Sequence, residues 1–131
     1  MAKYVYPAVF TPENKGYSVI FPDLEGCYTC GDSLEDAMYM ANDVLAFTLY
    51  GYEKSGRSIP APSNCKDVNT NQDEFVSLVM CDTLEYQKMN NNKAVKKTLS
   101  IPEWLNEAAT EANINFSQVL QNALKEQLNL Q

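Results

Sequence analysis

Apolar and β-branched residues come in short runs near the start of the chain, and turn-forming residues separate the runs. Such runs predict β-strands, because branched and aromatic side chains pack well on a pleated surface. Three of them are present, at residues 3–10, 17–21 and 27–31. The intervening prolines, glycines and asparagine favour turns, so we expect an antiparallel meander. Pro7 removes one backbone donor, which predicts an edge position or a bulge there.

A long amphipathic helix is predicted after the meander. Ser33 can cap it, and Asp36 stands three residues on, where a capping box needs an acceptor. From Leu34 to Tyr52 apolar side chains recur at helical spacing. After a proline-containing connection, residues 74–80 (EFVSLVM) predict a fourth strand. Its almost continuous apolar run predicts burial on both faces.

The composition becomes polar from Asp82 and ends in an asparagine cluster, which predicts a linker. Beyond it, Ala94–Ile101 (AVKKTLSI) predicts a strand. Two short amphipathic helices follow, the first beginning at Pro102 and the second capped by Asn115. The predicted organisation is therefore a first domain at 1–89, a linker at 90–93 and a tail domain at 94–131.

The tail cannot bury its apolar residues within one chain. Alternation along its strand puts Val95, Lys97, Leu99 and Ile101 on one face, and Lys96, Thr98 and Ser100 on the other. A unit this small lacks a sufficient core, and a lone strand leaves its backbone groups unpaired. Both problems disappear when two chains pair these strands antiparallel and interlock their helices. The tail therefore predicts a homodimer.

Charge and targeting signals narrow the class of protein. The chain carries a formal net charge of −7, so binding to nucleic acid must come from a local basic patch. Residues 88–97 supply one, because they hold four lysines and no acid. The chain resembles neither a secreted precursor nor a membrane protein, since it has no apolar run of the ~20 residues that a membrane helix needs. We expect a cytoplasmic protein.

The chain contains no histidine, which excludes a Ser-His-Asp triad, a Cys-His pair and imidazole metal ligands. Cys27 and Cys30 form a CxxC pair, a spacing also found in zinc and redox sites. No second CxxC completes a zinc site, and positions three apart on a strand point to opposite faces. Reduced thiols in the cytoplasm are the preferred interpretation. We predict no metal and no cofactor.

The tail resembles a ribbon-helix-helix domain, on Lys96-Lys-Thr-Leu-Ser-Ile-Pro102 followed by Asn115-Phe-Ser117. That resemblance implies that a two-stranded ribbon enters the major groove of operator DNA. The implied base contacts are Lys96, Thr98 and Ser100. The implied phosphate contacts are Lys97 and, at the start of the second helix, Asn115, Phe116 and Ser117.

The first domain is similar to the HicB antitoxin family. The resemblance rests on Gly16-Tyr-Ser-Val-Ile-Phe-Pro-Asp23, Gly26-Cys27, Gly31-Asp-Ser-Leu-Glu-Asp-Ala37 and Ile59-Pro-Ala-Pro-Ser63. Cys27 fits the family pattern, whereas Cys30 does not belong to it. The resemblance implies a partial ribonuclease H-like fold and a HicA toxin as partner, a small basic ribonuclease that cleaves messenger RNA.

The first domain is predicted to be catalytically empty. A ribonuclease H site gathers carboxylates around magnesium, one of them on the first strand. Strand 3–10 has no Asp or Glu. We expect inhibition of the toxin by occlusion of its RNA site, with acidic side chains competing for a basic surface. The candidate toxin contacts are Asp23, Glu25, Asp43, Asp73 and Glu74.

The predicted fold is α+β, a β-β-β-α-β first domain with a ribbon-helix-helix tail that forms an intertwined dimer. The predicted function is an antitoxin, not an enzyme, that masks its toxin and represses its own operon. A ribbon-helix-helix repressor with a ligand-sensing first domain is the main alternative. A nuclease and a purely structural protein rank below it. Self-association of the first domains, giving a tetramer, stays open.

Overall fold

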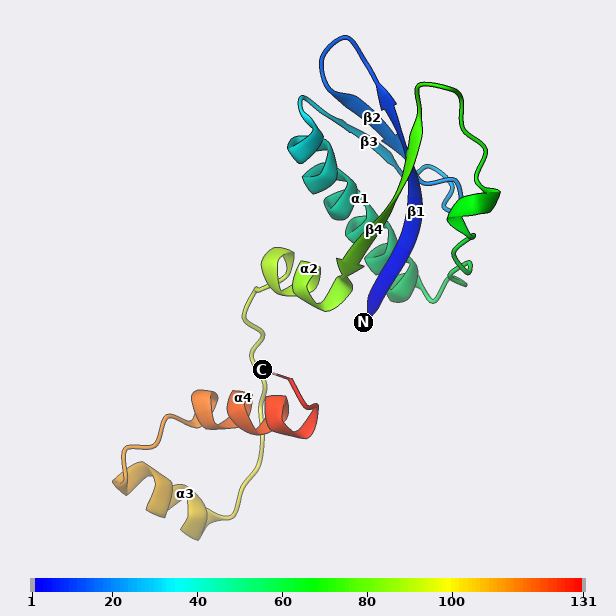
Figure 1. Ribbon diagram of the computed structural model, residues 1–131. Coiled ribbons are helices and arrows are strands. Elements are labelled where there is room, and N and C mark those ends of the chain that lie inside the picture. The colour runs from blue at the N-terminus through cyan, green and yellow to red at the C-terminus, as the bar shows by residue number, and fades with distance from the viewer. Residues whose placement is uncertain (1, 131) are drawn as a thin grey trace. The chain divides into compact units, whose positions relative to one another are not determined.

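The computed structural model of the chain describes residues 2–130 (Figure 1). It divides into two compact units, one ending at Lys93 and the other beginning at Ala94. The first unit holds a four-stranded sheet and two α-helices, and the second holds two further α-helices.

The first unit is an antiparallel sheet with a long helix on one face (Figure 1). Its strands are β1 (Lys3–Pro12), β2 (Tyr17–Ile20), β3 (Tyr28–Gly31) and β4 (Phe75–Asp82). They lie in the order β3-β2-β1-β4, and each neighbouring pair is antiparallel. Helix α1 (Leu34–Ser55) connects β3 to β4, with a 3-10 turn, Cys65–Asp67, in the connection. The predicted β-β-β-α-β order is confirmed.

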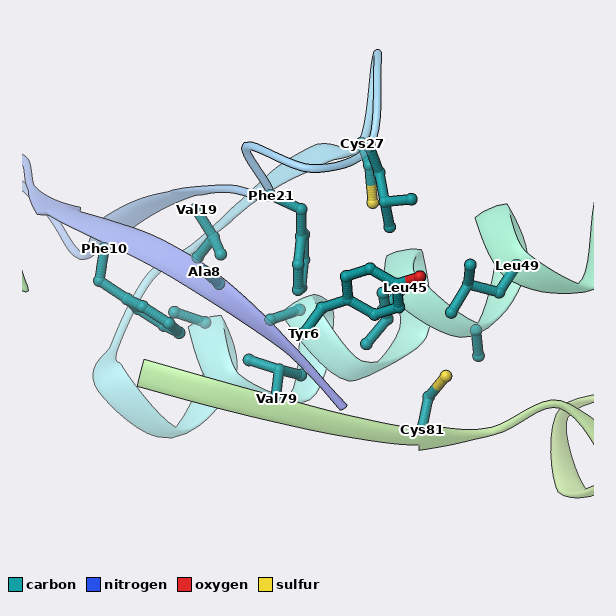
Figure 2. Close-up of a cluster of buried hydrophobic side chains, with 14 of the residues drawn as sticks. Tyr6, Ala8, Phe10, Val19, Phe21, Cys27, Leu45, Leu49, Val79 and Cys81 are labelled. Atoms are coloured by element: carbon teal, nitrogen blue, oxygen red, sulfur yellow. The ribbon is translucent and has the colours of Figure 1, made fainter. Parts of the chain in front are cut away.

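The core lies between the sheet and α1. Figure 2 shows Tyr6 and Phe10 of β1 and Val79 of β4 on the side of the sheet that faces the helix, and Leu45 and Leu49 on the helix. All five side chains are buried. Burial of a large apolar side chain contributes about 1.5–3 kcal/mol, so this layer stabilises the unit.

Half of the predicted capping box is present at the start of α1, because Ser33 caps the helix but the Asp36 carboxylate bonds the Asp32 amide in place of the Ser33 amide. Ser33 accepts a hydrogen bond from the Asp36 amide at 3.1 Å, and the Asp36 carboxylate accepts one from the Asp32 amide at 2.9 Å. The helix ends at Gly56, whose φ of 72° is left-handed and suits glycine. These local signals explain why the boundaries of α1 can be predicted from sequence.

Gly31 lets α1 approach β3 closely. A Cβ atom at Gly31 would lie 2.3 Å from the Ala37 nitrogen and 2.5 Å from the Ala37 Cα. Ala37 is fully buried, so neither side of this contact has room for a larger residue. The spacing from Gly31 to Ala37 therefore has a packing reason.

Pro7 does not lie on an edge strand, since β1 is paired with both β2 and β4. The β1–β4 register runs from Lys3 opposite Asp82 to Phe10 opposite Phe75 without a bulge. The Thr83 amide donates to the Ala2 carbonyl at 3.0 Å, so by alternation the nitrogen of Pro7 points away from β4. Pairing with β2 begins only at Val9. The backbone N–H that Pro7 lacks would therefore point to a place where no strand is paired with β1.

β4 is an edge strand, and the prediction that both of its faces are buried is wrong. Val79 and Cys81 point into the core, whereas Leu78 and Met80 are 56% and 61% exposed. Helix α1 covers only one face of the sheet, so only the side chains of β4 that point to that face are buried. The hydrophobic pattern did not reveal this, because it reports side-chain type and not what lies opposite.

The sequence reading also missed a helix, α2 (Thr83–Asn90), in the polar stretch after β4. Asp82 caps it, since its carboxylate accepts hydrogen bonds from the amides of Leu84 at 2.9 Å and Glu85 at 3.4 Å. Tyr86 packs against the core and contacts the rings of Phe47 and Tyr50 on α1. Tertiary packing stabilises this helix, whose apolar stripe is too short to stand out in the sequence.

The tail unit contains α3 (Glu103–Glu111) and α4 (Phe116–Gln127). Asn113, with a φ of 57°, ends α3, and Asn115 caps α4. Residues 94–101, predicted as a strand, form neither strand nor helix. A strand needs a partner for its backbone groups, and a single chain offers none here. The ribbon and its intertwined dimer therefore stay predictions.

Candidate functional sites

The tail has no core of its own. No residue of α3 or α4 is buried. The exposed large apolar side chains of the tail unit are Val95, Leu99, Ile101, Trp104, Leu105, Ile114, Phe116, Val119, Leu120, Leu124 and Leu128. A folded domain that exposes this much apolar surface needs a partner to cover it.

Many of these side chains line one groove of about 580 Å³. Its walls are formed by Leu105 and Ala109 of α3 and by Val119, Leu120 and Ala123 of α4. The segment before α3 also contributes, with Lys97, Leu99 and Ile101 lining the groove.

Lys96, Thr98 and Ser100 do not line this groove, and all three are exposed. Of the four residues predicted to share the other face, Lys97, Leu99 and Ile101 line the groove and Val95 does not.

The first turn of α4 presents backbone amides. Asn115 accepts a hydrogen bond from the Gln118 amide at 3.1 Å through its side-chain oxygen. The amides of Phe116 and Ser117 precede that bond and have no acceptor within the helix, as for any first turn. Both residues are exposed. A helix start of this kind favours an anion.

Asp23 and Glu25 lie in the turn between β2 and β3 and differ in their contacts. The Asp23 carboxylate accepts a hydrogen bond from the Ser63 amide at 2.9 Å and another from the Ser63 hydroxyl. It thereby holds the connection after α1 against the turn. Glu25 is exposed.

The other three predicted acids lie near β4. Asp73 and Glu74 come directly before the strand. The Glu74 carboxylate accepts hydrogen bonds from the Asn71 amide at 2.8 Å and the Thr11 hydroxyl at 2.7 Å. These two bonds lower the pKa of Glu74, the bond from Asn71 having the larger effect.

Asp43, on α1, lies at the other end of β4 in a pocket of about 200 Å³ between α1 and α2. Asp82 and Glu85 line the same pocket. The remaining lining residues are Tyr39, Asn42, Ala46, Tyr86, Met89 and Asn90. The sequence reading missed Asp82 and Glu85 as candidate contacts, because their place in the pocket depends on α2.

The two cysteines of the CxxC pair have different environments. Cys27 is buried, and it accepts a hydrogen bond from the Thr48 hydroxyl at 3.4 Å, whereas Cys30 is exposed on β3. Burial raises the pKa of the Cys27 thiol, which disfavours the reactive thiolate. Among residues 2–130, no three Cys, Asp or Glu side chains gather as a metal ion would require.

An acidic α+β unit followed by a tail without a core defines a binding protein made of two parts. The chain belongs to the HicB-like antitoxin family of bacterial toxin–antitoxin systems, whose family model matches residues 6–123. This is an antitoxin family and not a family of enzymes. No helix in the described part of the chain is both long and apolar enough to cross a membrane.

Two curated relatives illustrate the similarity. An uncharacterized 14.9 kDa protein of Haemophilus phage HP1 is 32% identical over 76 residues, which cover 58% of this chain and 56% of the relative. Antitoxin HicB 2 of Photorhabdus laumondii is 40% identical over 58 residues, which cover 44% of this chain and 42% of the relative. The chain thus spans about half the length of the curated relatives it matches.

Solved structures extend the similarity to the fold. A chain from a toxin–antitoxin complex of Streptococcus pneumoniae matches with a TM-score of 0.62 and 28% identity, covering 95% of this chain and 99% of that chain. A chain of the HicA3 and HicB3 toxin–antitoxin complex matches with a TM-score of 0.51 and 20% identity, covering 60% of this chain and 99% of that chain. The crystal structure of antitoxin HicB3 matches with a TM-score of 0.52 and 22% identity, covering 95% of this chain and 97% of that chain.

Proposed function

We propose that this chain is an antitoxin whose first unit binds and masks a HicA-type toxin that cleaves messenger RNA. The observation that carries the proposal is family membership over residues 6–123. The similar S. pneumoniae chain, 28% identical over nearly its whole length, was solved in a toxin–antitoxin complex. A toxin that grips RNA needs a basic surface, and the net charge of −7 on this chain suits a competitor for that surface. Inhibition then requires occlusion and no chemistry.

The tail serves as the DNA-binding and dimerisation unit in this proposal. Two copies pair residues 94–101 as an antiparallel ribbon, and each places its helices over the other's groove. This arrangement covers the exposed apolar residues of α3 and α4 and gives the unpaired backbone a partner. Repression of the operon follows when the ribbon enters the major groove of an operator with two-fold symmetry.

Each predicted DNA contact has a place in this arrangement. Lys96, Thr98 and Ser100 do not line the groove, so in a paired ribbon they are available to base edges. The amides of Phe116 and Ser117, with the Asn115 cap, suit a phosphate at the start of α4. Lys97 lies on the groove side, and its long stem lets the ammonium reach phosphate from there.

The experiment that tests the proposal has two arms. The chain is co-expressed with the small open reading frame beside its gene, and we expect the two proteins to co-purify and toxicity to be suppressed. The purified chain is then titrated with DNA from upstream of its own coding sequence, where we expect binding that weakens steeply with salt. No complex and no rescue, with DNA binding intact, would favour the ligand-sensing repressor instead.

A further inference from the structure

The outer edge of β4 carries backbone groups that no strand pairs. In the β1–β4 register, Thr83 donates to the opposed Ala2 carbonyl at 3.0 Å. Hydrogen-bonded pairs alternate along antiparallel strands. The intermediate residues Val76, Leu78 and Met80 therefore turn their amides and carbonyls away from β1. In the described part of the chain no further strand lies beyond β4.

A hydrogen bond on this edge agrees with the deduced direction. The side-chain amide of Asn42, on α1, donates to the Met80 carbonyl. A carbonyl already bonded to β1 would not need that donor, so its bond to Asn42 fits an outward direction. Asn42 is exposed and can release the carbonyl to another donor.

The edge lacks the features that usually prevent strands from pairing with other chains. From Phe75 to Cys81 there is no charged residue and no proline, and the register shows no bulge. Leu78 and Met80 are more than half exposed beside this edge. A long, apolar and uncharged edge strand is a site for strand addition unless something covers it.

Acidic side chains stand at both ends of the edge. Asp73 and Glu74 precede the strand. Asp82, at its far end, shares the α1–α2 pocket of about 200 Å³ with Asp43 and Glu85. An incoming strand would therefore meet an apolar middle and two negative ends. Basic side chains near the ends of that strand would complement this pattern.

We propose that the β4 edge binds an extended segment of a basic protein, which adds a fifth strand to the sheet and places a Lys or Arg in the α1–α2 pocket. The inference rests on the proposed function, in which the toxin is that protein. Main-chain hydrogen bonds supply affinity in this mode of recognition, and the pocket supplies specificity. Of the five acids predicted as toxin contacts, Asp43, Asp73 and Glu74 flank this edge.

A second copy of the chain is a poorer occupant of the same edge. Antiparallel pairing centred on Leu78 would put Glu74 of one copy opposite Asp82 of the other. Like charges in directly opposed positions destabilise a strand pair. A basic partner strand meets no such repulsion at either end.

The backbone part of the proposal is tested with Leu78→Pro in the full chain, with Leu78→Ala as matched control. Proline removes the outward amide, while alanine shortens the same side chain and keeps the amide. We expect affinity for the co-purified toxin to fall about tenfold or more for proline and much less for alanine. Circular dichroism establishes that each variant is folded.

The charge part is tested with the double variant Asp43→Lys, Glu85→Lys. The double variant Glu13→Lys, Glu35→Lys is the control, since it makes the same charge change at two exposed acids outside the α1–α2 pocket. We expect the double variant to weaken toxin binding about tenfold or more, with a loss that shrinks in high salt, and the control to bind as the original chain does. These variants decide the matter if Leu78→Pro does not fold.

The outcomes separate this inference from the proposed function. If the unaltered chain does not bind the toxin, the proposed function fails first. If it binds, and both sets of variants bind equally well, the β4 edge is not the toxin site. If Leu78→Pro reduces the particle mass in light scattering and leaves toxin affinity unchanged, the edge pairs copies of the chain and the inference is overturned.

Discussion

The Asp23 carboxylate in the turn between β2 and β3 accepts hydrogen bonds from both the amide and the hydroxyl of Ser63, forty residues along the chain. The bond from the Ser63 amide is 2.9 Å long. It joins two segments that carry separate sequence motifs, Gly16–Asp23 and Ile59–Ser63. Asp23 therefore holds the connection after α1 against the turn between β2 and β3.

Asp23→Ala should reduce the free energy of unfolding by about 1–2 kcal/mol, because a carboxylate bonded to two donors is lost. The measurement is urea unfolding followed by circular dichroism. Ser63→Ala removes only the hydroxyl bond and should cost less. Toxin affinity of the folded Asp23→Ala protein should stay within about twofold, so a loss of tenfold or more would return Asp23 to the toxin site.

Leu120→Glu should break the tail dimer. Leu120 lines the tail groove, and a buried unpaired carboxylate at a dimer interface is costly. Light scattering should show a lower mass, and operator binding should be lost while toxin binding persists. Gln121→Glu, one position further on α4 and outside the groove, serves as the control. A Leu120→Glu protein with unchanged mass would contradict the proposed dimer.

Lys96→Ala should weaken operator binding and reduce its dependence on salt. A dimer carries two copies of each lysine, so the salt slope should fall by about two counterions if both reach phosphate and by less if they bind bases only. Thr98→Ala should change sequence preference with little effect on the slope. Lys15→Ala, in the hairpin between β1 and β2, removes the same charge from the first unit and should leave binding unaltered.

Gly31→Ala and Gly51→Ala should have opposite effects on stability. A Cβ at Gly31 would lie 2.3 Å from the Ala37 nitrogen, whereas one at Gly51 meets nothing within 4 Å. We expect Gly31→Ala to cost about 1–3 kcal/mol through overpacking. Gly51→Ala, inside α1, should stabilise by about 0.5–1 kcal/mol. Thermal unfolding of the two variants measures both, and equal midpoints would contradict the close contact between β3 and α1.

The first unit should lose stability between about pH 9 and pH 12. Burial raises the pKa of the Cys81 thiol to about 12, with Asp82 and Glu53 adding to the effect. The pKa of the Tyr4 hydroxyl is also raised to about 12. Burial is the largest cause, and the hydrogen bond to Glu53 is the second. The folded chain keeps both protons where the unfolded chain releases them, so rising pH favours unfolding. Stability is complete below about pH 9 and falls toward pH 12.

Urea midpoints at several pH values measure that loss. Cys81→Ala removes one of the groups whose pKa is raised in the folded chain, so its stability should fall less steeply over this range than that of the unaltered chain. Cys30→Ala, at an exposed thiol, should show the same slope as the unaltered chain. Identical slopes for all three proteins would contradict the assignment to Cys81.

The sequence by itself determined the elements whose signals are local. The Ser33 cap and the apolar stripe along α1 both belong to the helix that they define. The same holds for Asn115 at the start of α4. Motif spacing also pointed to the antitoxin family, which the family model then showed. Such signals need no knowledge of what packs opposite.

Tertiary structure decided what depends on distant neighbours. Only the sheet order showed that β4 is an edge strand and that Pro7 lies where no donor is needed. Helix α2 is stabilised by the packing of Tyr86 against the rings of Phe47 and Tyr50 on α1. The five acids separated into two groups once their strands were placed. Residues 94–101 remain unpaired in a single chain, because a strand is completed by another strand and its own residues cannot supply one.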